Sequence, residues 1–263
     1  MSQWNKVTPA KPCVVCGKGD WCLVSPDGQV SLCNRIESER RCKTGWLHGS
    51  PAKPAQPRQV PRPPPESALD ADAWYNAVRL VSKVDKLDAW ADKLGLPESA
   101  IDVLGACTLG DILAFPMYDG TGAICGIRTR YQDGRKMAVR GSKAGIFLPT
   151  FHGDDEPLIC EGPTDSAAAV ALNFEPIGRP SCTGSEDIVV ATCKRFGYDK
   201  ITLCADADGP GVAGGKRMAD VLRAARVQVR LVAPIGHKDL RDWYKAGATR
   251  QVVDGAWGQA RWV

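Results

Sequence analysis

The 263-residue sequence predicts an α/β protein in which a mostly parallel sheet core follows a mixed α+β subdomain and a small N-terminal metal-binding domain. Three observations predict this arrangement. From about residue 157 onward, apolar strand segments alternate with helical segments, which is typical of a parallel sheet with helices on both faces. The preceding region contains shorter strand-like segments joined by glycine-containing turns. Five of the 11 cysteines lie within the first 42 residues, where clustered thiols predict a metal site.

A proline-rich segment separates the cysteine-rich head from the body of the chain. Seven of the 19 prolines fall in residues 50–66, which also carry three basic residues. Such a segment cannot bury a core and is expected to be an extended, semi-rigid linker. The predicted organisation is a zinc-binding domain at 1–49, a linker at 50–66, a mixed subdomain at 67–156 and a parallel-sheet domain at 157–263.

The net charge of +4 is unevenly distributed along the chain. Residues 1–65 carry a surplus of six basic residues, while the remainder has a deficit of two. A basic head favours binding to a polyanion, with a solubilising surface as the alternative interpretation. No apolar run approaches the roughly 20 residues that cross a bilayer, and the N-terminus lacks the apolar stretch of a signal peptide. We therefore expect a cytoplasmic protein without a membrane partner, in which disulfides are rare.

The spacing Cys13-Val-Val-Cys16 is typical of a metal knuckle, in which two thiolates lie on one tight turn. A hairpin is predicted next, with strands at 21–25 and 29–33 around a Pro-Asp-Gly turn, and it would return Cys33 to the knuckle. A closing strand at 45–47 would then end beside a histidine. We rank the candidates for the fourth ligand in the order His48, Cys42, Cys22. A sulfur-rich, closed set suits structural zinc better than catalytic zinc, and unliganded reduced cysteines are the alternative.

The body is predicted to begin with helices and then to form strands. Apolar positions at helical spacing predict one helix over 70–94 and a second, short one over 97–104. Three strands with turns are expected at 112–117, 122–130 and 135–140. In the parallel-sheet domain, strands are predicted at 158–160, 201–205 and 227–232. The helices between and after them are expected at 165–172, 186–195, 214–225 and 240–245.

Carboxylates follow the ends of the predicted parallel strands. Glu161 comes directly after the first strand, Asp206 and Asp208 after the second, and Asp239 after the third. Because ligands of open α/β sheets bind at the carboxyl ends of the strands, we expect these side chains to gather at one edge. Crowded carboxylates favour a cation, and hard oxygen ligands suit Mg²⁺ or Mn²⁺. A single Asp-x-Asp is more often a solvated loop or a helix cap, so the prediction depends on the ordered set.

Basic residues concentrate on the strands that precede this region. Six of them fall within sixteen residues: Arg128, Arg130, Arg135, Lys136, Arg140 and Lys143. Clustered cations beside a carboxylate–metal site suit nucleotide phosphates and a template backbone. An edge strand protected by charge is the alternative interpretation.

The acidic set resembles the TOPRIM domain of bacterial-type primases, topoisomerases and some nucleases. The segments that carry the resemblance are Glu161-Gly-Pro-Thr-Asp165, Asp206-Ala-Asp208 and Lys238-Asp239-Leu-Arg-Asp242. The resemblance implies that Glu161 takes part in acid/base chemistry or metal contact, and that Asp206 and Asp208 bind Mg²⁺ or Mn²⁺. It implies a further site carboxylate at Asp239 and supporting carboxylates at Asp165 and Asp242.

Two further segments resemble parts of phage primases. The head is similar to their zinc ribbon, but a second Cys-x-x-Cys pair starting at Cys33 would need a ligand at Ile36. Residues 115–147 are similar to the subdomain that precedes TOPRIM in these enzymes, where basic residues line the groove for template and NTP. Residues 67–156 would accordingly be the N-terminal subdomain of an RNA polymerase core. The stretch through Gly215-Lys216 departs from a phosphate-binding helicase loop, so a replicative helicase is expected as a separate partner.

The resemblance implies a DNA primase that makes short RNA primers from NTPs on single-stranded DNA. It also implies a protein that works in a bacterial host cell and is encoded by a phage or a mobile element. Two alternatives stay open from the sequence. One is a TOPRIM nuclease, which would cleave nucleic acid without NTPs; a topoisomerase fragment is disfavoured, because that activity would need a nucleophilic tyrosine in a further large domain. The other is a non-catalytic DNA-binding or helicase-loading adaptor, against which the intact acidic set argues.

Overall fold

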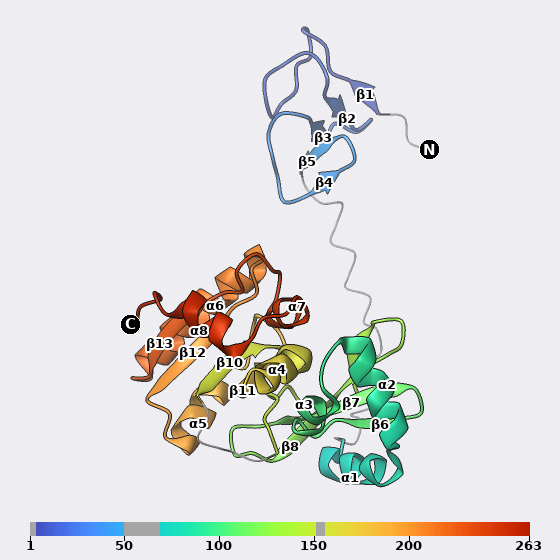
Figure 1. The fold of residues 1–263 in the computed structure, drawn as a ribbon. Helices are drawn as coiled ribbons and strands as arrows, with labels where there is room; N and C mark the ends of the chain where they lie inside the picture. Colours follow the sequence, from blue (N-terminus) through green and yellow to red (C-terminus); the bar gives the residue numbers. More distant parts are fainter. Residues whose placement is uncertain (1–3, 50–68, 151–155) are drawn as a thin grey trace. The chain divides into compact units, whose positions relative to one another are not determined.

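The computed structural model describes residues 4–49, 69–150 and 156–263, which belong to two compact units, Met1–Pro65 and Glu66–Val263 (Figure 1). The predicted linker at 50–66 lies outside the described residues. We describe the two units, the head and the body, separately.

The head is built on a five-stranded antiparallel sheet with the order β1-β2-β3-β5-β4. Its strands are Asn5–Lys6 (β1), Leu23–Val24 (β2), Val30–Cys33 (β3), Arg41–Cys42 (β4) and Gly45–Gly49 (β5). The predicted hairpin is confirmed as β2 and β3, with Leu23 opposite Leu32. The predicted closing strand is confirmed as β5, which pairs with β3. The sequence did not reveal the two short strands β1 and β4.

The body begins with three helices, Ala71–Val81 (α1), Val84–Leu94 (α2) and Glu98–Asp102 (α3). The prediction of one helix over 70–94 was wrong, because the chain becomes extended at Ser82 (φ −64°, ψ 138°). There the hydroxyl of Ser82 accepts a hydrogen bond from the backbone N–H of Thr108 (2.9 Å), and Lys83 N–H donates to the Thr108 hydroxyl (3.2 Å). These bonds replace the intrahelical ones at the break.

An antiparallel sheet of four strands follows, in the order β6-β7-β8-β9. Its strands are Cys107–Leu109 (β6), Ile112–Tyr118 (β7), Ile124–Arg130 (β8) and Lys136–Ala138 (β9). The three predicted strands correspond to β7, β8 and β9, and β6 was not predicted.

The second sheet of the body is parallel, with the order β11-β10-β12-β13. Its strands are Pro157–Glu161 (β10), Glu175–Arg179 (β11), Lys200–Cys204 (β12) and Gln228–Val232 (β13). The helices are Gly162–Ala171 (α4), Glu186–Phe196 (α5), Gly209–Ala224 (α6), Leu240–Lys245 (α7) and Arg250–Trp257 (α8). Sequence reasoning missed α8 and also β11, whose Pro176 and Gly178 argue against a strand although all five of its residues are buried.

Helices cover both faces of the parallel sheet, as predicted (Figure 1). Side chains of α5 and α6 pack on Ile159, Ile177 and Ile201 of one face. Side chains of α4, α7 and α8 pack with Leu158 and Val232 on the other. The latter core continues through Phe147 and Phe115, so the antiparallel and parallel sheets of the body share one hydrophobic core. Across the described ranges, no helix combines the length and apolar character that a bilayer span requires.

The burial of β11 predicts that a side chain at Gly178 destabilises the body. A Cβ there would collide with the Ser166 hydroxyl and lie 3.0 Å from Cβ of Phe147, so Gly178→Val is expected to overpack the core and cost about 1–3 kcal/mol of unfolding free energy. Denaturant unfolding measures this loss. Gly255→Ala is the control, since its Cβ meets nothing within 4 Å and alanine favours a helix. Equal stability of Gly178→Val and the wild type would contradict the packing described here.

Candidate functional site

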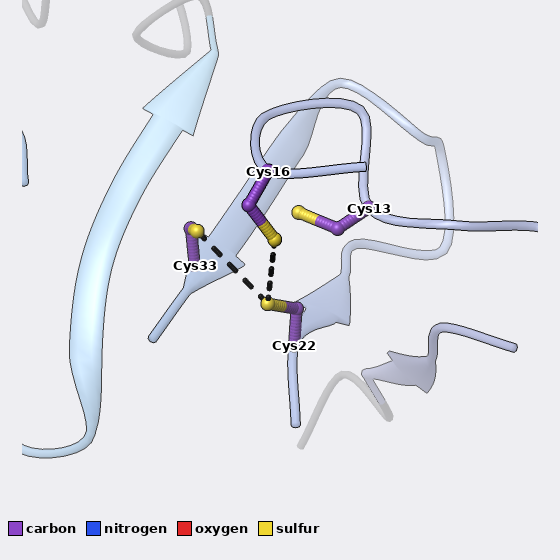
Figure 2. Close-up of side chains that lie close together, drawn as sticks. All are labelled: Cys13, Cys16, Cys22 and Cys33. Atoms are coloured by element: carbon purple, nitrogen blue, oxygen red, sulfur yellow. Dashed lines mark hydrogen bonds between the residues drawn. The ribbon is translucent and has the colours of Figure 1, made fainter. Parts of the chain in front are cut away.

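Four cysteines of the head form one compact cluster (Figure 2). The sulfur atoms of Cys13, Cys16, Cys22 and Cys33 all lie within 4.8 Å of one another. The Sγ–Sγ distances are 3.7 Å for Cys16–Cys22 and 4.0 Å for Cys22–Cys33. Four thiolates bound tetrahedrally to zinc at about 2.3 Å would be about 3.8 Å apart, so the donor set fits a structural zinc ion.

The predicted preference for His48 as the fourth ligand was wrong. His48 lies opposite Ser31 in the β3–β5 pair, two residues and therefore about 7 Å along the strand from Cys33. Its Nε2 atom is 2.9 Å from the carbonyl oxygen of Ile36 instead. Cys42, the second choice, lies in β4 and is not in the cluster.

The register of the hairpin formed by β2 and β3 explains why Cys22 is the fourth member of the cluster. Leu23 is opposite Leu32, so the antiparallel register continues to place Cys22 opposite Cys33. The thiols of Cys22 and Cys33 both lie in one cluster with those of the knuckle.

Hydrogen-bond donors lie beside three of the four sulfur atoms of the cluster. Arg35 Nη1 lies 3.9 Å from Cys16 Sγ and 3.8 Å from Cys22 Sγ, and the N–H of Ile36 donates to Cys33 Sγ at 3.4 Å. The backbone N–H of Lys18 lowers the pKa of Cys16 to about 6, whereas burial raises the pKa of Cys22 to about 12. Zinc binds the thiolate form, so Cys16 is prepared for metal, and a zinc ion would displace the proton of the buried Cys22 thiol.

A second cluster lies at the carboxyl edge of the parallel sheet in the body. Glu161 ends β10 and precedes α4, and Asp206 follows the neighbouring strand β12. Asp208 caps α6 by accepting the N–H of Gly211 (2.8 Å), and Asp239 caps α7 by accepting the N–H of Asp242 (2.8 Å). A cavity of about 320 Å³ opens between them. Its lining comprises Arg128, Lys136, Glu161, Gly162, Pro163, Thr164, Asp165, Pro180, Ser181, Asp206, Asp208, Lys238, Asp239 and Arg241.

The carboxylates of this cavity repel one another. Burial and the neighbouring Asp239 raise the pKa of Asp165 to about 8, although its Oδ1 accepts the N–H of Arg241 at 2.9 Å. Burial, followed by the charges of Glu161, Asp239 and Asp208, raises the pKa of Asp206 to about 7. Such a set favours a cation that neutralises it.

This oxygen cluster is more open than the thiol cluster. In the described part of the chain, only the four cysteines form a group of three or more His, Cys, Asp or Glu side chains whose ligand atoms lie close enough together to hold a metal ion. Mg²⁺ usually keeps several waters and is held by one or two carboxylates together with substrate phosphates. The carboxylate edge therefore fits a divalent ion shared with a phosphate ligand, and Glu161, Asp206 and Asp208 are the residues that would hold it.

Cations from two parts of the body line the same cavity. Arg128 of β8 and Lys136 of β9 come from the antiparallel sheet. Lys238 and Arg241 flank Asp239 and were not predicted, although they stand within the same motif. Partial burial and the neighbouring charges of Arg130 and Arg241 lower the pKa of Lys136. Crowded cations favour an anionic ligand.

Five predicted site residues do not line the cavity: Arg130, Arg135, Arg140, Lys143 and Asp242. Arg135 is paired within its own turn, 2.6 Å from Asp133 and 4.8 Å above the ring of Tyr131. Asp242 faces Arg241 at 4.0 Å. The predicted contacts of these residues with nucleotide or template, and the supporting role of Asp242, stay predictions.

These features define a class of fold, which combines a head containing a four-thiol cluster with an α/β body built on a four-stranded parallel sheet. Searches against protein-family models and curated protein sequences found no match. The primase fragment of the bacteriophage T7 primase-helicase protein is similar in structure, at 18% identity and a TM-score of 0.52, over 97% of this chain and 100% of that one.

A second solved structure, of bacteriophage T7 lagging-strand DNA polymerase interacting with primase domains bound to an RNA/DNA hybrid and dTTP, contains a chain that is also similar. The likeness has 18% identity and a TM-score of 0.50, over 63% of this chain and 89% of that one. At these identities the comparisons establish the fold, which resembles that of phage-type DNA primases.

The thiol cluster predicts how zinc binding responds to substitution. Cys22→Ser is expected to leave three thiolates and to lower the zinc content of the purified chain well below one ion per molecule. His48→Ala is the matched control and should keep one zinc ion, because His48 lies outside the cluster. Metal analysis after dialysis against a weak chelator measures both. Loss of zinc from His48→Ala but not from Cys22→Ser would refute the assignment.

The raised pKa of Asp206 predicts a pH-dependent stability. Between about pH 4 and about pH 7 the folded carboxyl holds a proton that the unfolded chain releases, so its contribution to stability falls as pH rises through this window. Without added divalent metal, Asp206→Asn should therefore raise the melting temperature of the body more at about pH 8 than at about pH 5, by a few degrees. Asp220→Asn, at an exposed position of α6, serves as the control. An Asp206→Asn effect that does not grow with pH would contradict the crowding.

Proposed function

We propose that this protein is a DNA primase that synthesises short RNA primers from NTPs on a single-stranded DNA template, with the help of a divalent metal ion. The observation that carries the proposal is the cavity of the body, in which carboxylates from two neighbouring parallel strands face cations from a separate antiparallel sheet. Nucleotidyl transfer needs both charges, one to hold the metal and the other to hold the triphosphate. The structural likeness to a phage primase fragment supports the same reading.

The proposed reaction joins the 3′-hydroxyl of one nucleotide to the α-phosphate of the next. A bond forms between O3′ and the α-phosphorus, the bond from this phosphorus to the bridging oxygen breaks, and pyrophosphate leaves. Mg²⁺ or Mn²⁺, when bound, supplies a Lewis acid that favours loss of the hydroxyl proton and neutralises the leaving group. Catalysis of this kind consists mainly of positioning and charge neutralisation.

Each part of the cavity has a proposed role in that step. Glu161, Asp206 and Asp208 would hold the metal ion, and Glu161 would also accept the proton of the 3′-hydroxyl. Asp239 keeps the negative potential high and caps the helix that carries Arg241. The cations Arg128, Lys136, Lys238 and Arg241 would bind the triphosphate and release it as pyrophosphate. Asp165, buried below, accepts the N–H of Arg241 and so positions that turn.

The head would act as the reader of the template. Its zinc ion would stabilise a small basic sheet, and its net positive charge favours a nucleic acid. A replicative helicase acting in trans would supply the single-stranded DNA, and the host cytoplasm would supply the NTPs.

Primer synthesis is measured by incubating the full-length protein with single-stranded DNA, labelled NTPs and Mg²⁺ or Mn²⁺. Short oligoribonucleotides are expected from the wild type, and Asp206→Ala should reduce them by at least about 100-fold because it removes a metal ligand. Asp220→Asn is the control, since this exposed residue of α6 lies away from the cavity and should leave synthesis unchanged. Degraded DNA in place of RNA products would support a TOPRIM nuclease instead. Bound DNA without any chemistry would support the adaptor.

A further inference from the structure

Trp21 of the head has an unusual combination of backbone conformation and exposure. Its φ is +61°, a region that bulky residues rarely adopt, and its side chain is 77% exposed. The N–H of Cys22 donates to the carbonyl of Asp20 at 2.9 Å, which closes a tight three-residue turn with Trp21 at its centre. Glycine adopts this conformation without steric cost, so the turn by itself does not explain a tryptophan. Because the ring is exposed, burial within the head does not explain it either.

Two side chains that follow Cys33 hold this turn in place. The amide Nδ2 of Asn34 donates to the carbonyl of Trp21. Arg35 donates to the carbonyl of Asp20 at 2.9 Å and pairs with its carboxylate at 2.8 Å. Arg35 also lies within 3.9 Å of two cluster sulfurs. Arg35 therefore connects the turn to the thiol cluster. In this turn the Cys22 side chain is buried in the head, while the Trp21 ring is exposed to solvent.

A cavity of about 480 Å³ lies beside the exposed ring. Val7, Leu23 and Leu32 contribute apolar surface, while Asp20, Asn34 and Thr44 contribute polar groups. Lys6 contributes a cation. Its volume falls within the range of small-ligand sites, and its lining combines apolar surface with a few polar groups, as such sites do.

We infer that Trp21 and this cavity form a nucleobase-binding site for single-stranded DNA, in which one base of the template stacks on the indole. Aromatic stacking is the usual way in which proteins hold unpaired bases. The polar groups of the cavity suit the edge of the base, and Lys6 suits the adjoining phosphate. The described head carries seven Lys/Arg against four Asp/Glu, a balance that complements a polyanion such as a nucleic acid better than a basic or neutral partner surface. The inference deepens the proposed function and rests on it, because it gives the head's template binding a specific location.

The test uses the full-length, zinc-loaded protein and fluorescein-labelled single-stranded DNA of random sequence. Trp21→Ala is expected to weaken binding, measured by fluorescence anisotropy, by about 5- to 150-fold, the loss expected for one base–aromatic stack. Trp21→Phe keeps an aromatic ring and should restore most of the affinity. Val14→Ala is the matched control, since Val14 is an equally exposed apolar residue of the head that does not line the cavity.

Trp21→Gly separates the ring from the turn. Glycine suits the positive φ, so this variant should keep the wild-type zinc content and melting temperature while losing DNA affinity as Trp21→Ala does. A photo-crosslinking arm with 5-iododeoxyuridine in the DNA should attach to the tryptic peptide 19–35 in the wild type and in Val14→Ala. It should not attach there in Trp21→Gly.

The outcomes distinguish this inference from the proposed function. Unchanged DNA affinity of both Trp21→Ala and Trp21→Gly would overturn the base-binding site and would favour a protein partner for the exposed ring, whether or not primers are made. Weakened binding by these variants, together with a wild type that makes no primers under any condition, would retain the site and reject the primase. If primers are made, Trp21→Gly should lose synthesis at limiting template and recover it at saturating template.

Discussion

The body depends on one constraint, the direct parallel pairing of β10 with β12 at the centre of its sheet. Two parallel neighbours end at the same edge, so the carboxylates that follow them are forced together. Burial, followed by mutual repulsion, raises the pKa values of Asp165 and Asp206. The negative charge at this edge of the sheet is stabilised only when positive groups lie nearby. Four basic residues line the same cavity: Arg128, Lys136, Lys238 and Arg241. The cavity is thus a place where metal and phosphate are expected together.

The two clusters of the protein illustrate two ways of preparing a metal site. The head brings four sulfur atoms within 4.8 Å and places N–H donors beside three of them, which suits a closed structural site. The body leaves its carboxylates farther apart and lines the remaining space with cations, which suits an ion whose coordination a substrate completes. In the head, Arg35 connects the closed site to the turn at Trp21, so metal binding and display of the aromatic ring depend on the same few residues.

Much of the fold and of the carboxylate edge was predictable from local patterns. Strands that alternate with helices predicted the parallel sheet, and the position of Glu161 and Asp206 directly after two of these strands predicted that they would meet. The errors arose where distant contacts override local preference. Ser82 interrupts the predicted helix because Thr108 offers hydrogen bonds, and β11 exists despite Pro176 and Gly178 because its neighbours bury it. The fourth member of the thiol cluster depends on the hairpin register, which places Cys22 opposite Cys33 and which the local pattern around His48 does not reveal.

By itself, the sequence determined the residue types and their order: the cysteine-rich head, the alternating strands, and the carboxylates that end them. It determined these because apolar periodicity and ligand chemistry are local properties of the chain. Only the tertiary structure decided which residues share a site. It selected Cys22 over His48, brought Lys238 and Arg241 into the cavity and left Arg135 in its own turn. Strand order, register and the direction of a single turn make these choices, since each moves a side chain by several ångströms without changing the local pattern.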